Sequence, residues 1–194
     1  MVIKYKTIAR SSFVDICTGL DCIGSKIRLT LALVAGLAAL AAACESQARD
    51  FVSFPQDYPP GTIIIKHSER RLYFTTGPGT AVRYPVAIGR AGRAWQGETS
   101  VQGKFIAPDW SAPWVVRRDH PELSRVIPGG SPRNPMGAAA ITLDLSEVAI
   151  HGTSPGMRRS VGTAASYGCI RMYNEDVVDL YRRVEIGTPV VAIP

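Results

Sequence analysis

A histidine and a cysteine lie close together in the last third of the chain, each beside a glycine. Residues 149–172 read AIHGTSPGMRRSVGTAASYGCIRM, with Cys169 eighteen positions after His151. Acyl transfer through a thiol needs a nucleophile that ionises, a base within hydrogen-bond reach, and donors that face the developing oxyanion. We therefore predict an acyl-transfer site in which Cys169 is the nucleophile and His151 is the general base and acid.

The residues around the cysteine have side chains that suit this chemistry. Gly168 carries no side chain, so its backbone N–H and that of Cys169 are expected to approach the oxyanion. Ser166 is predicted to brace the turn through hydrogen bonds, with Tyr167 as a further support. In an extended segment Arg171 projects to the same face as the cysteine, where it would stabilise the thiolate or bind a substrate carboxylate. A neighbouring imidazolium is expected to lower the thiol pKa.

The histidine ends a β-prone run, and Gly152 allows a sharp turn directly after it. The imidazole of His151 is therefore predicted at a sheet edge. The other two histidines, His67 and His120, are predicted to be surface or turn residues. A zinc site would need one of them to converge on Cys169, and no ligand-pair spacing supports this. We expect no metal and no other cofactor.

The elements that position this site are predicted to be mainly strands. Strands are expected over residues 62–67, 70–76, 82–88, 103–107, 138–145, 147–151 and 188–193. The first two are separated by a short polar gap and predict a hairpin. A single helix is predicted to start with Asn174 as its N-cap, to carry acidic residues in its first turn, and to end at Gly187. The fold is therefore expected to be mainly β, a sandwich or barrel with one C-terminal helix.

The longest irregular stretch, residues 111–135, is rich in proline. Long loops in compact domains are usually either functional or disordered. We expect this one to be ordered and to pack over the site, with Trp114 and Met136 as substrate-binding residues.

Composition limits the class of protein. The chain has 194 residues, of which 46% are hydrophobic and 20% charged, and this indicates one globular domain with a short additional segment. The net charge is +6. No stripe of basic residues with interleaved aromatics is present, so nucleic-acid binding is not expected. The remaining interpretations are a basic surface or an anionic substrate such as a cell-wall polymer.

The N-terminal segment, residues 1–48, has the pattern of an export signal. Residues 29–43 are uncharged and follow two basic residues. The run is shorter than the roughly 20 residues of a membrane-spanning helix, and it ends in small residues. Cleavage after Ala43 or Ala48 is predicted, with lipidation of Cys44 or a retained N-terminal membrane-targeting segment as alternatives.

Removal of this segment leaves Cys169 as the only cysteine of the mature domain. A single thiol in an oxidising compartment is a liability unless it has a use. Residues 49–61 are predicted to be a linker or N-terminal strap, and residues 62–194 to form the catalytic domain.

The order of motifs resembles a known family. His151-Gly152-Thr153 followed by Ser166-x-Gly168-Cys169-Ile170-Arg171-Met172 closely resembles the signature of the L,D-transpeptidase catalytic domain family, the YkuD-like enzymes. The segments IPGG (127–130), NPMG (134–137), NEDVVDLY (174–181) and GTPV (187–190) also resemble that family. Tyr167 departs from the pattern, because many relatives have histidine there, and this puts its part in substrate contact in doubt.

The resemblance implies a function. It implies a mostly β enzyme of the bacterial cell envelope or periplasm, in which the backbone carbonyl of Gly152 orients the histidine. It implies attack on the third residue of a peptidoglycan tetrapeptide stem, usually diaminopimelate, with loss of the terminal D-Ala. An amine then resolves the thioester, which gives a cross-link or attachment to an outer-membrane protein acceptor. Membrane contact is expected only through the N-terminal signal or a lipid anchor. The alternatives are an L,D-carboxypeptidase, with water as acceptor, and a non-catalytic wall-binding module.

Overall fold

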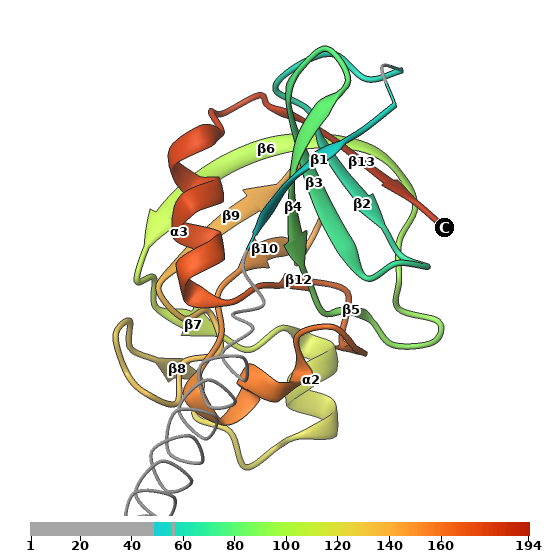
Figure 1. Cartoon of the computed structure of the whole chain (residues 1–194). Helices are drawn as coiled ribbons and strands as arrows, with labels where there is room; N and C mark the ends of the chain where they lie inside the picture. Colours follow the sequence, from blue (N-terminus) through green and yellow to red (C-terminus); the bar gives the residue numbers. More distant parts are fainter. Residues whose placement is uncertain (1–48, 56) are drawn as a thin grey trace, which may run out of the picture. The chain divides into compact units, whose positions relative to one another are not determined.

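The structure, a computed structural model, describes residues 49–55 and 57–194 (Figure 1). The predicted export signal and the lipidation site at Cys44 lie outside the described residues. Within the described ranges, no helix combines the length and the apolar character needed to cross a membrane.

Nine strands form one mixed sheet, in the order β1-β4-β3-β2-β13-β6-β9-β10-β12. They are β1 (Asp50–Ser53), β2 (Ile63–Lys66), β3 (Arg71–Gly77), β4 (Thr80–Pro85), β6 (Gly97–Ile106), β9 (Ala139–Leu143), β10 (Ala149–His151), β12 (Ile170–Arg171) and β13 (Pro189–Ile193). The C-terminal strand β13 joins the two halves, since it pairs parallel with β2 and antiparallel with β6. The prediction of a mainly β fold is confirmed.

Smaller elements surround this sheet. Two-stranded sheets form between β5 (Ile88–Gly89) and β11 (Ala164–Ser166) and between β7 (Trp110–Ser111) and β8 (Val126–Ile127). The helices are α2 (Trp114–Asp119), the 3₁₀ helix η1 (Pro155–Ser160) and α3 (Asn174–Arg183). The predicted C-terminal helix is α3. Helices α2 and η1 were not predicted, because six residues are too few to show an amphipathic period.

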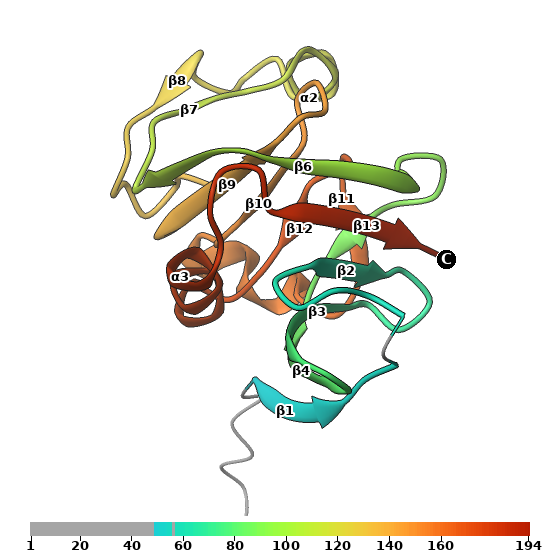
Figure 2. The same cartoon turned by 90° about the horizontal axis from the view of Figure 1, so that it is seen from above.

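The main core lies between the sheet and α3 (Figures 1 and 2). Strand β2 is buried on both faces, which explains its uninterrupted run of isoleucines. Ile63 and Ile65 belong to the main core, whereas Ile64 packs with Phe54 and Tyr73 in a second cluster. The centre of the sheet therefore packs against apolar side chains on both faces.

Two predictions need correction. The segment 49–61, predicted to be a linker or N-terminal strap, contains a strand, because Asp50–Ser53 form β1 and pair antiparallel with β4. Phe54 anchors the segment in the second cluster. Strand β6 begins at Gly97 and not at residue 103, since its polar first part pairs with β13 and its second part with β9. In both places, pairing with distant strands overrides a weak local pattern.

Candidate active site

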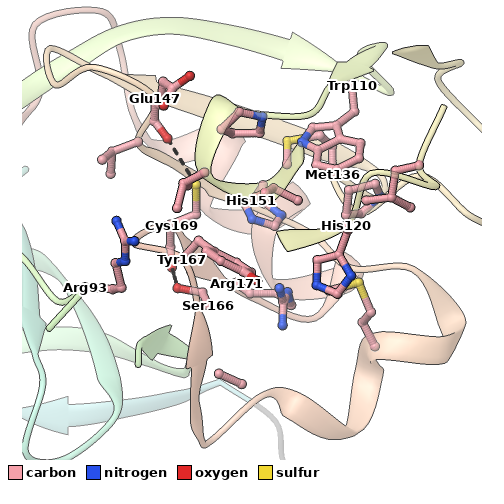
Figure 3. Close-up of a pocket in the computed structure, with 18 of the residues that line it drawn as sticks. Arg93, Trp110, His120, Met136, Glu147, His151, Ser166, Tyr167, Cys169 and Arg171 are labelled. Atoms are coloured by element: carbon pink, nitrogen blue, oxygen red, sulfur yellow. Dashed lines mark hydrogen bonds between the residues drawn. The ribbon is translucent and has the colours of Figure 1, made fainter. Parts of the chain in front are cut away.

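The cysteine and the histidine line one cleft because their strands run side by side. Strands β10 and β12 are parallel neighbours, with His151 opposite Arg171. Cys169 comes two residues before Arg171, so it lies on the face of the sheet that carries His151. The cleft has a volume of about 750 Å³ (Figure 3). Its walls include the predicted residues His151, Ser166, Tyr167, Cys169, Arg171, Met136 and Trp114.

His151 is buried and oriented by the backbone. Only 3% of the residue is exposed, and β10 lies between β9 and β12. The prediction of a sheet-edge position was therefore wrong. Its Nδ1 lies 2.8 Å from the Gly152 carbonyl oxygen. That carbonyl can only accept, so Nδ1 carries the proton and Nε2 is left as a hydrogen-bond acceptor. Burial, together with the nearby charge of Arg171, lowers the pKa of His151 to about 4.

Cys169 is half-buried and its thiol is also neutral. The Sγ donates to the Glu147 carbonyl oxygen at 3.6 Å. Burial raises the pKa of the thiol, and a backbone hydrogen bond at Ala149 and the charge of Arg171 oppose this rise only in part. The expectation that an imidazolium lowers this pKa was wrong. With burial acting on both groups, the resting pair is a thiol and an imidazole.

The turn before Cys169 is held by Ser166. Its Oγ donates to the Cys169 carbonyl at 2.5 Å and accepts the Gly168 N–H at 3.1 Å. Gly168 has φ 134°, a left-handed conformation that favours glycine. Its N–H points into the turn and not toward an incoming carbonyl, which corrects the prediction made for Gly168.

Arg171 lies beneath the cleft and is only 6% exposed. Its Nη1 donates to Ser160 Oγ at 2.6 Å, while its buried Nε has no hydrogen-bond partner among the described residues. Burial lowers the pKa of this guanidinium, and the adjacent Cys169 acts in the opposite direction. A cation at this position stabilises negative charge on the sulfur.

Asn174 fixes the segment after the histidine. Its Oδ1 accepts the N–H groups of Ala138 and Thr153, and its Nδ2 donates to the Thr153 carbonyl, each at 3.0 Å. A Cβ at Gly137 or Gly152 would collide with this amide. The prediction of Asn174 as N-cap was wrong, because Tyr173 is the N-cap of α3. The Asn174 side chain makes the three bonds above instead.

Residues 111–135 form one wall of the cleft, and the prediction that they pack over the site is confirmed. The Asn134 amide donates to the carbonyls of Pro108, Ile127 and Pro128 and thereby fixes the loop. The last residue of α2 contacts the turn before Cys169, since Asp119 Oδ2 accepts from the Tyr167 hydroxyl at 3.1 Å.

Arg90 completes this contact. Its guanidinium forms an ion pair with Asp119 at 3.1 Å and lies 4.0 Å from the centre of the Tyr167 ring. We refer to Arg90, Asp119 and Tyr167 together as the helix contact. Through it, Tyr167 joins α2 to the residues next to the nucleophile.

Sequence reasoning missed several residues of the cleft. Arg90, Arg93, Arg133 and Glu147 line it, and so does His120, which was predicted to be a surface or turn residue. His120 is exposed, but the surface it occupies is the cleft wall. These residues lie outside the motif, and no local spacing marks them. Over the described ranges, no group of three or more His, Cys, Asp or Glu side chains could hold a metal ion.

The comparisons with known proteins agree with this arrangement. The family model described as the L,D-transpeptidase catalytic domain, YkuD, matches residues 60–191. ErfK/SrfK of Escherichia coli K12, named a probable L,D-transpeptidase, is 34% identical over 139 residues, which are 68% of this chain and 43% of that protein. YkuD of Bacillus licheniformis is 42% identical over 138 residues, which are 71% of this chain and 68% of that protein.

A solved structure shows the same fold. L,D-transpeptidase 3 from Mycobacterium tuberculosis has a TM-score of 0.56 and 17% identity, and the match covers 69% of this chain and 60% of that one. At this identity the likeness concerns the fold alone. The chain spans less than half the length of the E. coli relative, 43% of it. With a match over most of its described residues, the chain belongs to the L,D-transpeptidase catalytic domain family.

Proposed function

We propose that this protein is a cysteine-dependent peptidoglycan L,D-transpeptidase. The observation that carries the proposal is the His151 imidazole, oriented by the Gly152 carbonyl at 2.8 Å, in the same cleft as the Cys169 thiol. The proposed donor is a tetrapeptide stem, attacked at the carbonyl of its third residue.

In the acylation step, the thiol proton passes to Nε2 of His151 as the sulfur attacks the carbonyl carbon. The oxyanion accepts a hydrogen bond from the backbone N–H of Cys169, because that of Gly168 is bonded to Ser166. The C–N bond then breaks, and the leaving D-Ala amine takes the proton from His151. A thioester on Cys169 remains.

In the second step an amine attacks the thioester carbonyl. The C–N bond forms, the C–S bond breaks, and the amine proton returns through His151 to the sulfur. A neighbouring stem peptide gives a cross-link, and an outer-membrane protein would give a covalent attachment. Because the resting pair is neutral, charge separates only while substrate occupies the cleft, and Arg171 stabilises the transient thiolate.

The proposed location is the bacterial envelope. The pattern of residues 1–48 supports export, followed by cleavage or by lipidation at Cys44. The substrate-binding roles proposed for Trp114 and Met136 are supported by their places on the cleft wall.

Mass spectrometry tests the proposal directly. The protein is incubated with a tetrapeptide muropeptide or a carbapenem, and a covalent adduct on Cys169 is expected, absent in Cys169→Ala and greatly slowed in His151→Ala. Arg171→Ala should slow acylation without unfolding the domain. Tripeptide without dimer or exchanged product would identify an L,D-carboxypeptidase. An unchanged reaction in Cys169→Ala would exclude the thiol mechanism.

A further inference from the structure

Two oppositely charged side chains flank the nucleophile on one side of the cleft. Figure 3 shows Arg93 and Glu147 on one side of Cys169, with Trp110 and Met136 on the other. Arg93 comes from the connection between β5 and β6, and Glu147 from the turn between β9 and β10. Both line the same cleft as the thiol.

The two charges are not neutralised by each other. Among the ion pairs of residues 49–194, none includes Arg93 or Glu147. The nearby Arg90, by contrast, is occupied by Asp119 and the Tyr167 ring. A cation and an anion are therefore presented to the cleft with a gap between them that exceeds an ion-pair distance.

The backbone fixes both residues relative to the sulfur. Glu147 has φ 60°, a strained conformation for a residue with a side chain, and such strain concentrates at functional sites. Its carbonyl oxygen accepts a hydrogen bond from the Cys169 thiol at 3.6 Å, and its Oε1 accepts one from the backbone N–H of Trp114 at 3.4 Å. The same residue thus contacts the nucleophile through its backbone and the cleft wall through its side chain.

Arg93 is held just as closely. A Cβ on Gly89 would lie 2.6 Å from the Arg93 carbonyl, and one on Gly168 would lie 3.4 Å from it. The Arg93 N–H donates to the Arg90 carbonyl at 2.8 Å. The guanidinium is therefore carried on a backbone packed against the turn of the nucleophile.

We propose that Arg93 and Glu147 form a subsite for an α-amino carboxylate group. The planar guanidinium suits a carboxylate, with two parallel hydrogen bonds, and the Glu147 carboxylate attracts the ammonium. This rests on the proposed function, because the diaminopimelate of a stem peptide ends in such a group. This α-amino carboxylate group can belong to either of two substrates. It can be the side-chain end of the third residue of the donor stem, or it can carry the amine of the incoming acceptor.

Acceptor choice and donor choice test the subsite separately. Transfer from a tetrapeptide donor is measured to D-methionine and to D-methioninamide, which lacks the carboxylate. Acylation of Cys169 is measured with donors carrying diaminopimelate or lysine at the third position. Arg93→Gln, Arg93→Lys and Glu147→Gln are compared with the exposed controls Arg182→Gln and Glu98→Gln, and circular dichroism checks folding.

If the acceptor uses the subsite, Arg93→Gln lowers transfer to D-methionine about tenfold or more relative to D-methioninamide, while Glu147→Gln lowers both. If the donor uses it, Arg93→Gln slows acylation by the diaminopimelate donor selectively. Arg93→Lys should lie between Arg93→Gln and the unmodified protein. The subsite would be overturned if Arg93→Gln and Glu147→Gln matched the control variants in both measurements. These are the preference for D-methionine over D-methioninamide and the preference for the diaminopimelate donor over the lysine donor.

Direct binding separates this inference from the proposed function. Saturation-transfer NMR of D-methionine with full-length Cys169→Ala requires no catalysis. We expect a signal that is lost on adding Arg93→Gln and retained on adding Arg182→Gln. Failure of the unmodified protein to acylate at all would contradict the proposed function, whereas D-methionine binding that does not depend on Arg93 would contradict the subsite.

Discussion

Burial gives His151 a pKa of about 4, well below that of a free imidazole. The neutral form, which the proposed mechanism uses as the base, therefore predominates throughout the neutral range. We predict that the rate of Cys169 acylation changes little between about pH 5 and 8 and falls as the pH drops through about 4. A time course of adduct formation by mass spectrometry, at fixed donor concentration, measures this profile. A midpoint near 6.5 would show an exposed histidine instead.

Asn174 shows how much one side chain can contribute to a site without meeting the substrate. Its amide makes three backbone hydrogen bonds around the segment that follows His151. We predict that Asn174→Ala lowers the free energy of unfolding by roughly 2–3 kcal/mol, because buried backbone groups lose their partners. Asn174→Asp keeps the acceptor and should cost less. Urea unfolding measures both, and equal stability of the alanine variant would contradict this role.

The helix contact operates at the level of elements, because it joins α2 to the turn before Cys169. Arg118 and the other two members of the contact, Tyr167 and Arg90, lower the pKa of Asp119 to about 2, so it is ionised at every relevant pH. The contact is exposed, and surface ion pairs contribute little to overall stability. Its effect should therefore be local.

We predict that Tyr167→Phe and Asp119→Asn accelerate amide hydrogen exchange across residues 114–120 severalfold and raise the KM for the donor. The melting temperature should change by no more than in the exposed control Asp57→Asn. Hydrogen exchange with mass spectrometry resolves this segment. Unchanged exchange in both variants would mean that Asn134 and the loop backbone alone hold α2.

For the whole molecule, the buried side chains of His151 and Asp176 change the folding stability in opposite directions over nearly the same pH range. The depressed pKa of His151, from 6.5 to about 4, contributes stability that is present above 6.5 and is lost as the pH falls through 4. Burial, reinforced by Glu175, raises the pKa of Asp176 from 3.8 to about 6. Its contribution is present below 3.8 and is lost as the pH rises through 6. Each amounts to roughly 3 kcal/mol, so the two nearly cancel.

We predict that Asp176→Asn stabilises the protein at pH 7.5 by up to roughly 3 kcal/mol, because an ionised buried carboxylate is replaced by a neutral amide. The gain should shrink as the pH falls and vanish below about 4. The variant should therefore lose stability on acidification more steeply than the unmodified protein. Thermal unfolding across this range tests the prediction, and a gain that does not depend on pH would contradict it.

Some of these features could be predicted from the sequence and others could not. Cys169 and His151 stand in a short, ordered motif. β2 is marked by its run of isoleucines, and α3 by its amphipathic period. Arg93, Glu147 and the bonds of Asn174 depend on the pairing of β10 with β12 and on loop packing, which no local pattern encodes. Burial of the histidine was missed for the same reason. The error in the thiol pKa followed from the burial of Cys169 itself, which no local pattern marks.

The protonated resting thiol has a consequence for small-molecule reactivity. Alkylating reagents and peroxides consume thiolates, so Cys169 should react with iodoacetamide more slowly than free cysteine at pH 7.5. An acylating compound that seats its carbonyl beside His151 creates the nucleophile as it binds. The cleft would then distinguish electrophiles by fit and not by intrinsic reactivity, which favours shape-matched acylating inhibitors over generic thiol reagents.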